Sequence, residues 1–394
     1  MNFKKLLNLS LLSGVGFIGL SGYFSSAQAM QLPAAQTYDA GPFGPLKADG
    51  GFDGLFYATS GTGENSILEK PDEVNKSTGS IFKSFDASLE KETGRIQFLL
   101  DIRMADSIYF GMLPRQKDFT EKTNTYTLGP IHDAYLTFPI TSYLSVSAGE
   151  IGSLGSYDSS KDWENAVITA SPLDHVGTSS GRGVMTSWTI GKVKAKIIYG
   201  DGFDDGVWNV IQARVHYYFT PDNIFVVYGL QTLGKKGSNV RAYGGGTIGY
   251  GYSAISANKN IYGIYEDYTV GNFNIIPQTQ YVYSKVIHSL GMNKMTSTFG
   301  LELETNYQFG NSPWSLGTQE TYYTSKGPYG WYLKPNSSGF SVGVSPAWVQ
   351  GHVFIRGEGG FFHLTNMGTD TGGFGKYGTN RNQVLGLLEA GFVF

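Results

Sequence analysis

Polar and apolar residues alternate along much of this chain, so that every second side chain shares one character. Apolar sets of this kind are Ile96, Phe98, Leu100 and Ile102; Ile211, Ala213, Val215, Tyr217 and Phe219; and Phe299, Leu301, Leu303, Tyr307 and Phe309. The alternate positions carry Arg95, Gln97, Asp101 and Arg103; Gln212, Arg214 and His216; and Glu302, Glu304, Asn306 and Gln308. A period of two predicts β-strands that separate an apolar medium from water.

The C-terminal segment 384–394 follows the same period. Counting back from Phe394, every second residue is uncharged, whereas the alternate face carries Gln383 and Glu389. This pattern is typical of the closing strand of an outer-membrane barrel, in which Phe392 and Phe394 would form the C-terminal barrel-assembly signal. A soluble edge strand could show the same alternation, so the rest of the chain has to decide.

Seven tight turns are predicted where Gly, Pro, Asn or Asp supplies the turn geometry. They lie at 91–94, 139–142, 191–192, 220–223, 271–272, 310–313 and 345–347. With one more strand at each end, they predict 16 strands, at about 51–60, 80–90, 95–105, 131–138, 143–152, 183–190, 193–200, 208–219, 223–233, 260–270, 273–287, 298–309, 314–325, 338–345, 350–364 and 381–394. We therefore predict an all-β, transmembrane, antiparallel up-and-down β-barrel with short periplasmic turns and long extracellular loops.

The alternation also assigns faces within these strands. We expect Val193, Ala195 and Ile197 to face lipid. In the strand that follows the turn at 220–223, the predicted outward set is Ile224, Val226, Tyr228 and Leu230. A soluble two-sheet sandwich would alternate as well, but rarely over strands of this length joined by short turns at one end and long loops at the other.

The N-terminus and the composition agree with a secreted barrel. Residues 1–29 have two lysines, an apolar stretch and a small-residue end at 27–29, the layout of a cleaved signal peptide, so the mature chain is expected to be 30–394. Removing the two lysines leaves 27 basic against 32 acidic residues, a balance that argues against a nucleic-acid partner.

The mature sequence contains no apolar run long enough for a spanning helix. Cysteine is absent, which excludes thiolate metal centres, thiol catalysis and covalently attached c-type haem in this chain.

Short glycine-rich motifs between residues 130 and 230 resemble the β-barrel porin-2, OmpL-like family. These motifs are His132–Thr137, Ala148–Gly155, Asp174–Gly177, Tyr199–Asp205 and Tyr217–Asn223. The resemblance implies an outer-membrane porin with passive solute passage, and it provides no catalytic residues to transfer.

The third extracellular loop, 153–182, is longer than two adjacent strands require and is the candidate for a constriction folded into the lumen. We predict an eyelet in which three loop acids face a basic wall on the neighbouring strands. The acids are Asp158, Asp162 and Glu164, and the wall is Lys194, Lys196 and Arg214. Lipid-facing lysines near the midplane would cost roughly 2–4 kcal/mol each, so the two lysines must point inward. The alternative is a loop that extends outward, with the lysines in water near the periplasmic rim.

Further charged residues point inward by alternation, either to pair with one another or to tune permeation. They are Arg95, Arg103, Glu302, Glu304, Arg356 and Glu358.

Other chemistry is poorly supported by the sequence. The segment 201–206 offers oxygen ligands suited to calcium but lacks a further acidic ligand at defined spacing, so it is interpreted as a solvated turn. The glycine-rich segment 244–250 has no P-loop lysine, and the six histidines lack the short paired spacing of metal sites. We predict no catalytic residues, no metal and no cofactor, although barrel enzymes that hydrolyse lipids exist.

The leading functional hypothesis is a porin in the outer membrane of a Gram-negative bacterium, through which small hydrophilic solutes or ions diffuse passively. Its expected partners are outer-membrane lipid and lipopolysaccharide, the barrel-assembly machinery, those solutes, and other copies of the chain in a homotrimer, for which Gly357 and Gly359 would permit close packing. The alternatives are a plugged barrel that acts as an adhesin or scaffold, and a sheath around a partner protein.

Overall fold

A computed structural model describes residues 30, 32–62, 76–105, 107–111, 130–155, 157–159, 161–177, 181–201, 208–233, 258–288, 292–332 and 334–394. The predicted signal peptide lies outside the described residues, as do residues 202–206 of the acidic segment and the glycine-rich segment 244–250. In the part of the chain that is described, no helix has the length and apolar character that crossing a membrane would require.

The described residues form strands almost throughout. The strands are β1 (Gln36–Asp39), β2 (Pro45–Thr59), β3 (Ser77–Lys91), β4 (Gln97–Ala105), β5 (Ile131–Pro139), β6 (Leu144–Ile151), β7 (Gly181–Ile190), β8 (Val193–Asp201), β9 (Val210–Thr220), β10 (Asn223–Thr232), β11 (Lys259–Val270), β12 (Phe273–Ser284), β13 (Thr296–Gln308), β14 (Trp314–Lys326), β15 (Ser337–Gln350), β16 (Val353–Met367) and β17 (Asn382–Val393). Short helical turns are η2 (Gly41–Phe43), η3 (Asp162–Glu164) and α1 (Pro172–His175).

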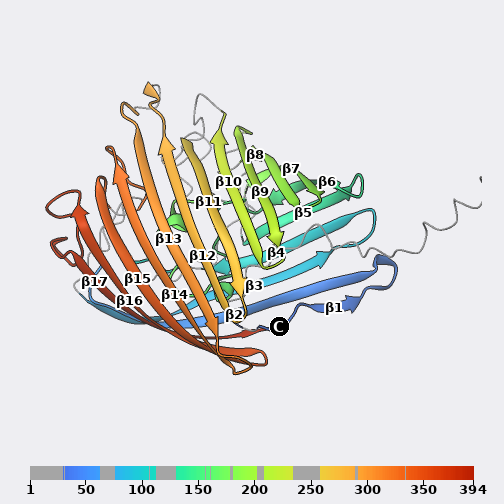
Figure 1. The fold of residues 1–394 in the computed structure, drawn as a ribbon, viewed down its shortest axis with the longest axis horizontal. Coiled ribbons are helices and arrows are strands. Elements are labelled where there is room, and N and C mark those ends of the chain that lie inside the picture. Colours follow the sequence, from blue (N-terminus) through green and yellow to red (C-terminus); the bar gives the residue numbers. More distant parts are fainter. Residues whose placement is uncertain are drawn as a thin grey trace, which may run out of the picture.

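Strands β2 to β17 form a closed barrel. Each pairs antiparallel with the next in sequence, and β17 pairs with β2 through the register Phe392 opposite Phe52. Figure 1 shows the strands following one another around the barrel, from blue β2 to red β17. The prediction of a 16-stranded antiparallel barrel is confirmed. The short strand β1, which pairs with β2, was not predicted, and β2 begins at Pro45 rather than near residue 51.

Alternation places apolar and aromatic side chains on the outer surface. In β13 Phe299, Leu301 and Tyr307 are exposed, whereas Glu302 and Glu304 are buried. The outward surface of a transmembrane barrel must be apolar because hydrocarbon offers no hydrogen bonds, and the exposure pattern of β13 follows the predicted faces.

The predicted outward face of β10 is wrong. Val226, Tyr228 and Leu230 are at most 3% exposed, whereas Val227 is 45% exposed. Val226 lies opposite the inward His216 of β9, after a register shift at Asn223. The buried side chains pack in an apolar cluster with Ile261 of β11, Ile276 of β12 and other residues inside the barrel. The prediction failed because it assumed that every side chain facing the lumen is polar.

The seventh predicted turn, at 345–347, is also wrong. Residues 345–347 lie inside β15, where Pro346 pairs with Leu316 of β14. The turn instead falls at Gly351 and His352, where Gly351 has φ 62°. Two-residue hairpin turns require positive φ, which glycine adopts without the clash of a Cβ atom. Proline cannot adopt it, since its ring holds φ near −65°.

We predict that Gly351→Val lowers the free energy of unfolding by about 1–2 kcal/mol, the cost of a left-handed conformation for a residue with a Cβ atom. No atom lies within 4 Å of a Cβ placed there, so the loss would come from backbone strain alone. Urea unfolding in lipid vesicles measures it. The control is Asn272→Val, at an exposed residue of another tight turn without positive φ. An equal loss in both variants would contradict this account of the turn.

Candidate functional site

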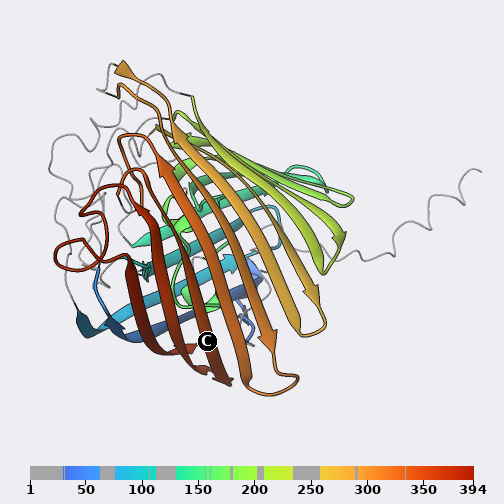
Figure 2. The same cartoon turned by 60° about the vertical axis from the view of Figure 1, so that its left-hand side comes forward.

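The segment between β6 and β7 runs along the inner wall of the barrel. We call its described residues, 152–155, 157–159 and 161–177, the inner loop; it contains η3 and α1. Trp163, Val167 and Leu173 are each at most 3% exposed. Its hydrogen-bond partners include inward side chains of β9, β12, β13 and β16. Figure 2 gives a view across the barrel, with this segment in green.

Glutamine side chains of the wall bind backbone groups of the inner loop. The oxygen of Gln212 accepts from Leu154 N at 3.1 Å, that of Gln278 accepts from Tyr157 N at 3.1 Å, and Gln280 Nε2 donates to Leu173 O at 2.8 Å. A buried backbone group without a partner would cost as much as a lost hydrogen bond, so these amides stabilise the path of the loop.

Two glutamates predicted to face the lumen do so and bind the inner loop. Glu358 on β16 accepts from Ile168 N at 2.5 Å, from Thr169 N at 2.9 Å and from Thr169 Oγ1 at 2.6 Å. Glu304 on β13 accepts from Ala166 N at 3.4 Å. Hydrogen bonds to an ionised acceptor are about twice as strong as neutral ones, which makes Glu358 a principal anchor of the loop.

Arg356 joins the inner loop to a buried network of charges. Its guanidinium donates to Asn165 O and Asp162 O, each at 2.8 Å, and its Nε pairs with Glu389 of β17. Glu389 also lies 2.7 Å from Lys83 Nζ of β3, which is 3.1 Å from Asp162 of the loop. Arg356, Glu389 and Lys83 are at most 1% exposed. We call Asp162, Lys83, Glu389 and Arg356 the charged clamp. Buried charges persist only where each has a close partner of opposite sign.

The three predicted loop acids have different surroundings. Asp162 belongs to the charged clamp, and Glu164 accepts from Ser159 Oγ at 2.6 Å. Asp158 accepts from Ser171 N at 3.1 Å and lies beside Glu302 and Glu304 of β13. Burial, together with the carboxylate of Glu302, raises the pKa of Asp158 well above its ordinary value.

The three basic residues of the predicted wall lie together on adjacent strands. Lys196 of β8 is opposite Arg214 of β9, and Lys194 is opposite His216. Lys194 Nζ lies 4.9 Å from the centroid of the Tyr218 ring, and Arg214 donates to the hydroxyl of Tyr265. All three basic side chains are half-buried rather than sealed, in contrast to Arg356.

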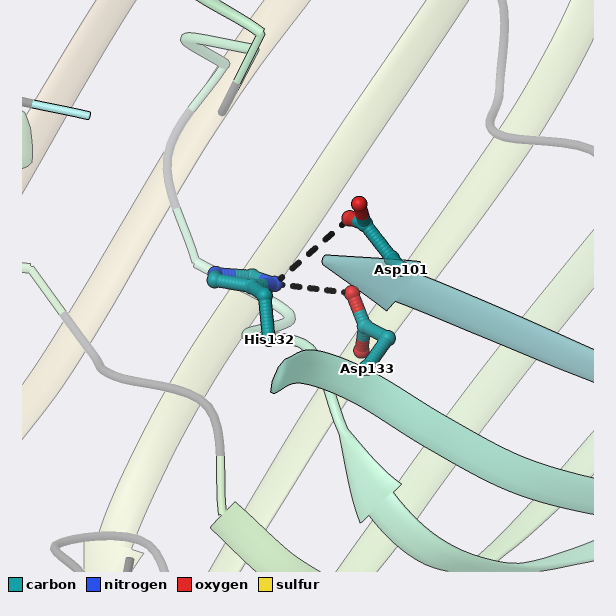
Figure 3. A group of neighbouring side chains, drawn as sticks. All are labelled: Asp101, His132 and Asp133. Atoms are coloured by element: carbon teal, nitrogen blue, oxygen red, sulfur yellow. Dashed lines mark hydrogen bonds and ion pairs between the residues drawn. The ribbon is translucent and has the colours of Figure 1, made fainter. Parts of the chain in front are cut away.

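A second cluster of titratable groups lies where β4 ends and β5 begins. Figure 3 shows His132 Nδ1 beside carboxylate oxygens of Asp133, at 2.8 Å, and Asp101, at 3.9 Å. Arg103, a predicted lumen residue, pairs with Asp101 and with Asp86 at 2.7 Å. The structure places Arg95 elsewhere: it is exposed in the bend before β4 and does not belong to the barrel wall.

The two C-terminal aromatic residues lie at the closure of the barrel. The ring of Phe392 stacks on Phe52 of β2 with centroids 5.9 Å apart. Phe394 N donates to Gly50 O at 2.8 Å, and Gly50 N donates to Phe394 O at 3.0 Å. Their role as a barrel-assembly signal stays a prediction.

The family model described as "Putative beta-barrel porin-2, OmpL-like" matches residues 50–394. The chain belongs to this family. It is therefore a porin of the bacterial outer membrane. No curated protein sequence matches it significantly.

Solved structures of several outer-membrane proteins share its fold. OmpT of Vibrio cholerae is 11% identical, with a TM-score of 0.56 over 90% of this chain and 98% of that one. A trimer form of that protein is 12% identical, with a TM-score of 0.53 over 89% of this chain and 99% of that one. An anion-selective porin from Comamonas acidovorans is 10% identical, with a TM-score of 0.54 over 89% of this chain and 99% of that one. At these identities the likeness extends to the fold only.

Sequence reasoning missed most partners of the inner loop. It assigned Glu389 to the inward face but identified neither Lys83 nor the three glutamines as loop contacts. Long polar side chains at inward positions were a usable signal, because they can reach backbone groups away from the wall. Lys83 had no such signal, since it lies at a register irregularity between β2 and β3.

We predict that Arg356→Met releases the inner loop from the wall. The change leaves three loop carbonyls without their donor and Glu389 with Lys83 as its remaining partner, and breaking a buried pair costs about 3–5 kcal/mol. Trypsin should then cleave after Lys161, which is 7% exposed in the intact loop, at a higher rate measured by fragment mass. Arg381→Met is the control, because Arg381 binds Leu364 O and Thr365 O rather than the loop. Equal cleavage in both variants would mean that the clamp does not hold the loop.

Proposed function

We propose that small hydrophilic solutes cross this porin along the β8 and β9 side of the lumen, past Lys194, Lys196 and Arg214. The supporting observation is the contrast in exposure between two sets of inward charges. Arg356 and Glu389 are sealed beneath the inner loop, whereas the three basic side chains are half-buried. A solute that stays hydrated requires accessible polar walls, which the basic set provides.

In this proposal the basic wall acts on solutes by itself, without the facing acids of the eyelet expected from the sequence. Asp162 pairs with Lys83 of β3, and Glu164 accepts from Ser159 within the loop. The three basic residues form a locally positive wall. The carboxylates of Glu90 and Asp133 also act on Lys196. In the proposed channel, this wall attracts anions and the negative ends of dipolar solutes.

We predict that the Lys194→Glu, Lys196→Glu double variant shifts ion selectivity towards cations. A unit charge about 4 Å from an ion in water contributes about 1 kcal/mol, so the cation-to-anion permeability ratio should change at least about fivefold. Single-channel recordings in a planar bilayer with a salt gradient measure the reversal potential. The control is Lys192→Glu, in the exposed turn. Discrete channel openings with unchanged ion selectivity would mean that these lysines do not line the solute path.

A plugged barrel is the second candidate, because the inner loop and residues 107–111 cover so much of the inner wall. Gly111 N donates to Gln383 of β17 at 2.7 Å, and the hydroxyl of Tyr332 donates to Phe110 O at 2.6 Å. If the purified protein gave no conductance, an adhesin, a scaffold or a sheath for a partner would replace the channel.

We further propose that the porin forms a homotrimer through β16, β17 and β2. On their outward faces Gly359 lies opposite Gly386, which lies opposite Ala58, so the backbones of a second copy can approach closely. The trimer form of the Vibrio cholerae protein, which shares the fold, is consistent with this arrangement.

We predict that Gly359→Trp converts trimers to monomers, since the indole would separate the two surfaces. Native mass spectrometry from detergent measures the assembly. The matched control is Val227→Trp, on the outward face of β10. Trimers that persist in Gly359→Trp would place the interface elsewhere on the barrel.

A further inference from the structure

Three carboxylates from two different parts of the chain meet inside the barrel. Asp158 belongs to the inner loop, and Glu302 and Glu304 are neighbours on the inward face of β13. One oxygen of each lies within 4.8 Å of an oxygen of each of the others. The group therefore spans the contact between the loop and the wall.

Each carboxylate leaves an oxygen buried without a hydrogen bond in the described part of the chain. These atoms are Asp158 Oδ1, Glu302 Oε2 and Glu304 Oε2. Glu302 is 5% exposed and Glu304 is 2% exposed. The other oxygens of Asp158 and Glu304 accept from Ser171 N and Ala166 N. Buried carboxylates that are not neutralised are costly, so this group calls for a positive charge.

A cation among the described residues that acts on this group is already committed. Arg356 acts on Glu304 but is paired with Glu389 in the charged clamp. Asp174, a further acid of the loop, adds to the negative charge around Asp158. Among the described residues no cation is dedicated to this group, so a cation from solution would complete it.

We propose that Asp158, Glu302 and Glu304 bind a divalent cation of the calcium type that joins the inner loop to β13. Calcium takes oxygen ligands at about 2.3–2.6 Å, so two ligands on opposite sides of the ion lie about 4.8 Å apart. The carboxylate oxygens fall within that span. Carboxylates and water suit hard cations such as calcium, whereas zinc prefers nitrogen and sulfur ligands.

The cluster of Asp101, His132 and Asp133 is the weaker candidate for a metal. Arg103 already pairs with Asp101, and His132 is engaged with Asp133 at 2.8 Å. A cation there would have to displace these contacts. Asp101 and Asp133 also each leave one buried oxygen without a hydrogen bond among the described residues, but Arg103 already brings a positive charge to that cluster, whereas the Asp158 group has no cation of its own there.

Terbium luminescence of the full-length protein, folded in detergent, tests the site. Tb³⁺ binds oxygen-rich calcium sites and emits when a neighbouring tyrosine is excited. Tyr157 precedes Asp158, and its ring lies 5.4 Å from that of Tyr265. We expect saturable emission that CaCl₂ abolishes and that MgCl₂ reduces less, since magnesium is smaller and loses water reluctantly.

The Glu302→Gln, Glu304→Gln double variant should bind Tb³⁺ at least roughly tenfold more weakly, since even changes in residues behind the ligands cost 10–100-fold. Glu320→Gln, on the adjacent strand with its side chain on the outer face, is the matched control and should bind as the wild type does. Folding of each variant is judged by heat-dependent gel mobility. If the double variant does not fold, Asp158→Asn, which changes only the loop ligand, tests the cation site instead.

Two results would overturn the proposal. One is the absence of saturable, calcium-displaced emission from the wild type, and the other is undiminished binding by Asp158→Asn or by the folded double variant. Because the measurement requires no conduction, its outcome is separate from that of the proposed solute path.

Discussion

A loop that runs through the interior of a barrel must find a hydrogen-bond partner for each backbone group that it removes from water. Here the partners are long side chains of the wall. Glu358 binds two successive N–H groups of the inner loop, and Arg356 binds the carbonyls of Asp162, the first residue of η3, and of Asn165, which follows it. Short residues at these positions could not bridge the distance to the loop. The polarity of the inner wall at β16 is therefore a requirement of the loop as much as of a water-filled channel.

Apolar contacts complete the attachment and divide the lumen into two unlike sides. Val226, Ile261 and Val282 of β10 to β12 pack in one cluster with Tyr157 and Val176 of the inner loop. Burying a side chain of this kind contributes about 1.5–3 kcal/mol. The side around β10 to β12 is thus closely packed beneath the loop. The side formed by β8 and β9 keeps half-buried charges, which is why the proposed solute path follows it.

The sequence predicted the barrel because lipid and water impose a period of two on every strand, and short turns divide the strands. It placed Glu302, Glu304, Arg356 and Glu358 inward for the same reason. The period alone does not say which face is inward, however, and β10 was reversed because Val226 and Leu230 are apolar beneath a loop. Pro346 misplaced one turn, since proline is tolerated at an outward strand position. Long inward polar side chains indicate which wall positions can reach the loop, but the sequence does not say which loop residue each one binds, because the contacts join residues as far apart as Asp162 and Arg356.

Two groups of buried acids in this barrel are neutralised in different ways. Glu389 lies between Arg356 and Lys83, so the chain itself supplies the opposing charges, and that attachment of the loop requires no added ion. Asp158, Glu302 and Glu304 have no equivalent cation dedicated to them among the described residues, and in our proposal they take one from solution. The inner loop would then have one fixed attachment near η3 and one adjustable attachment at Asp158. Because both attachments belong to a single loop, the concentration of the cation would change the inner surface without altering the strands.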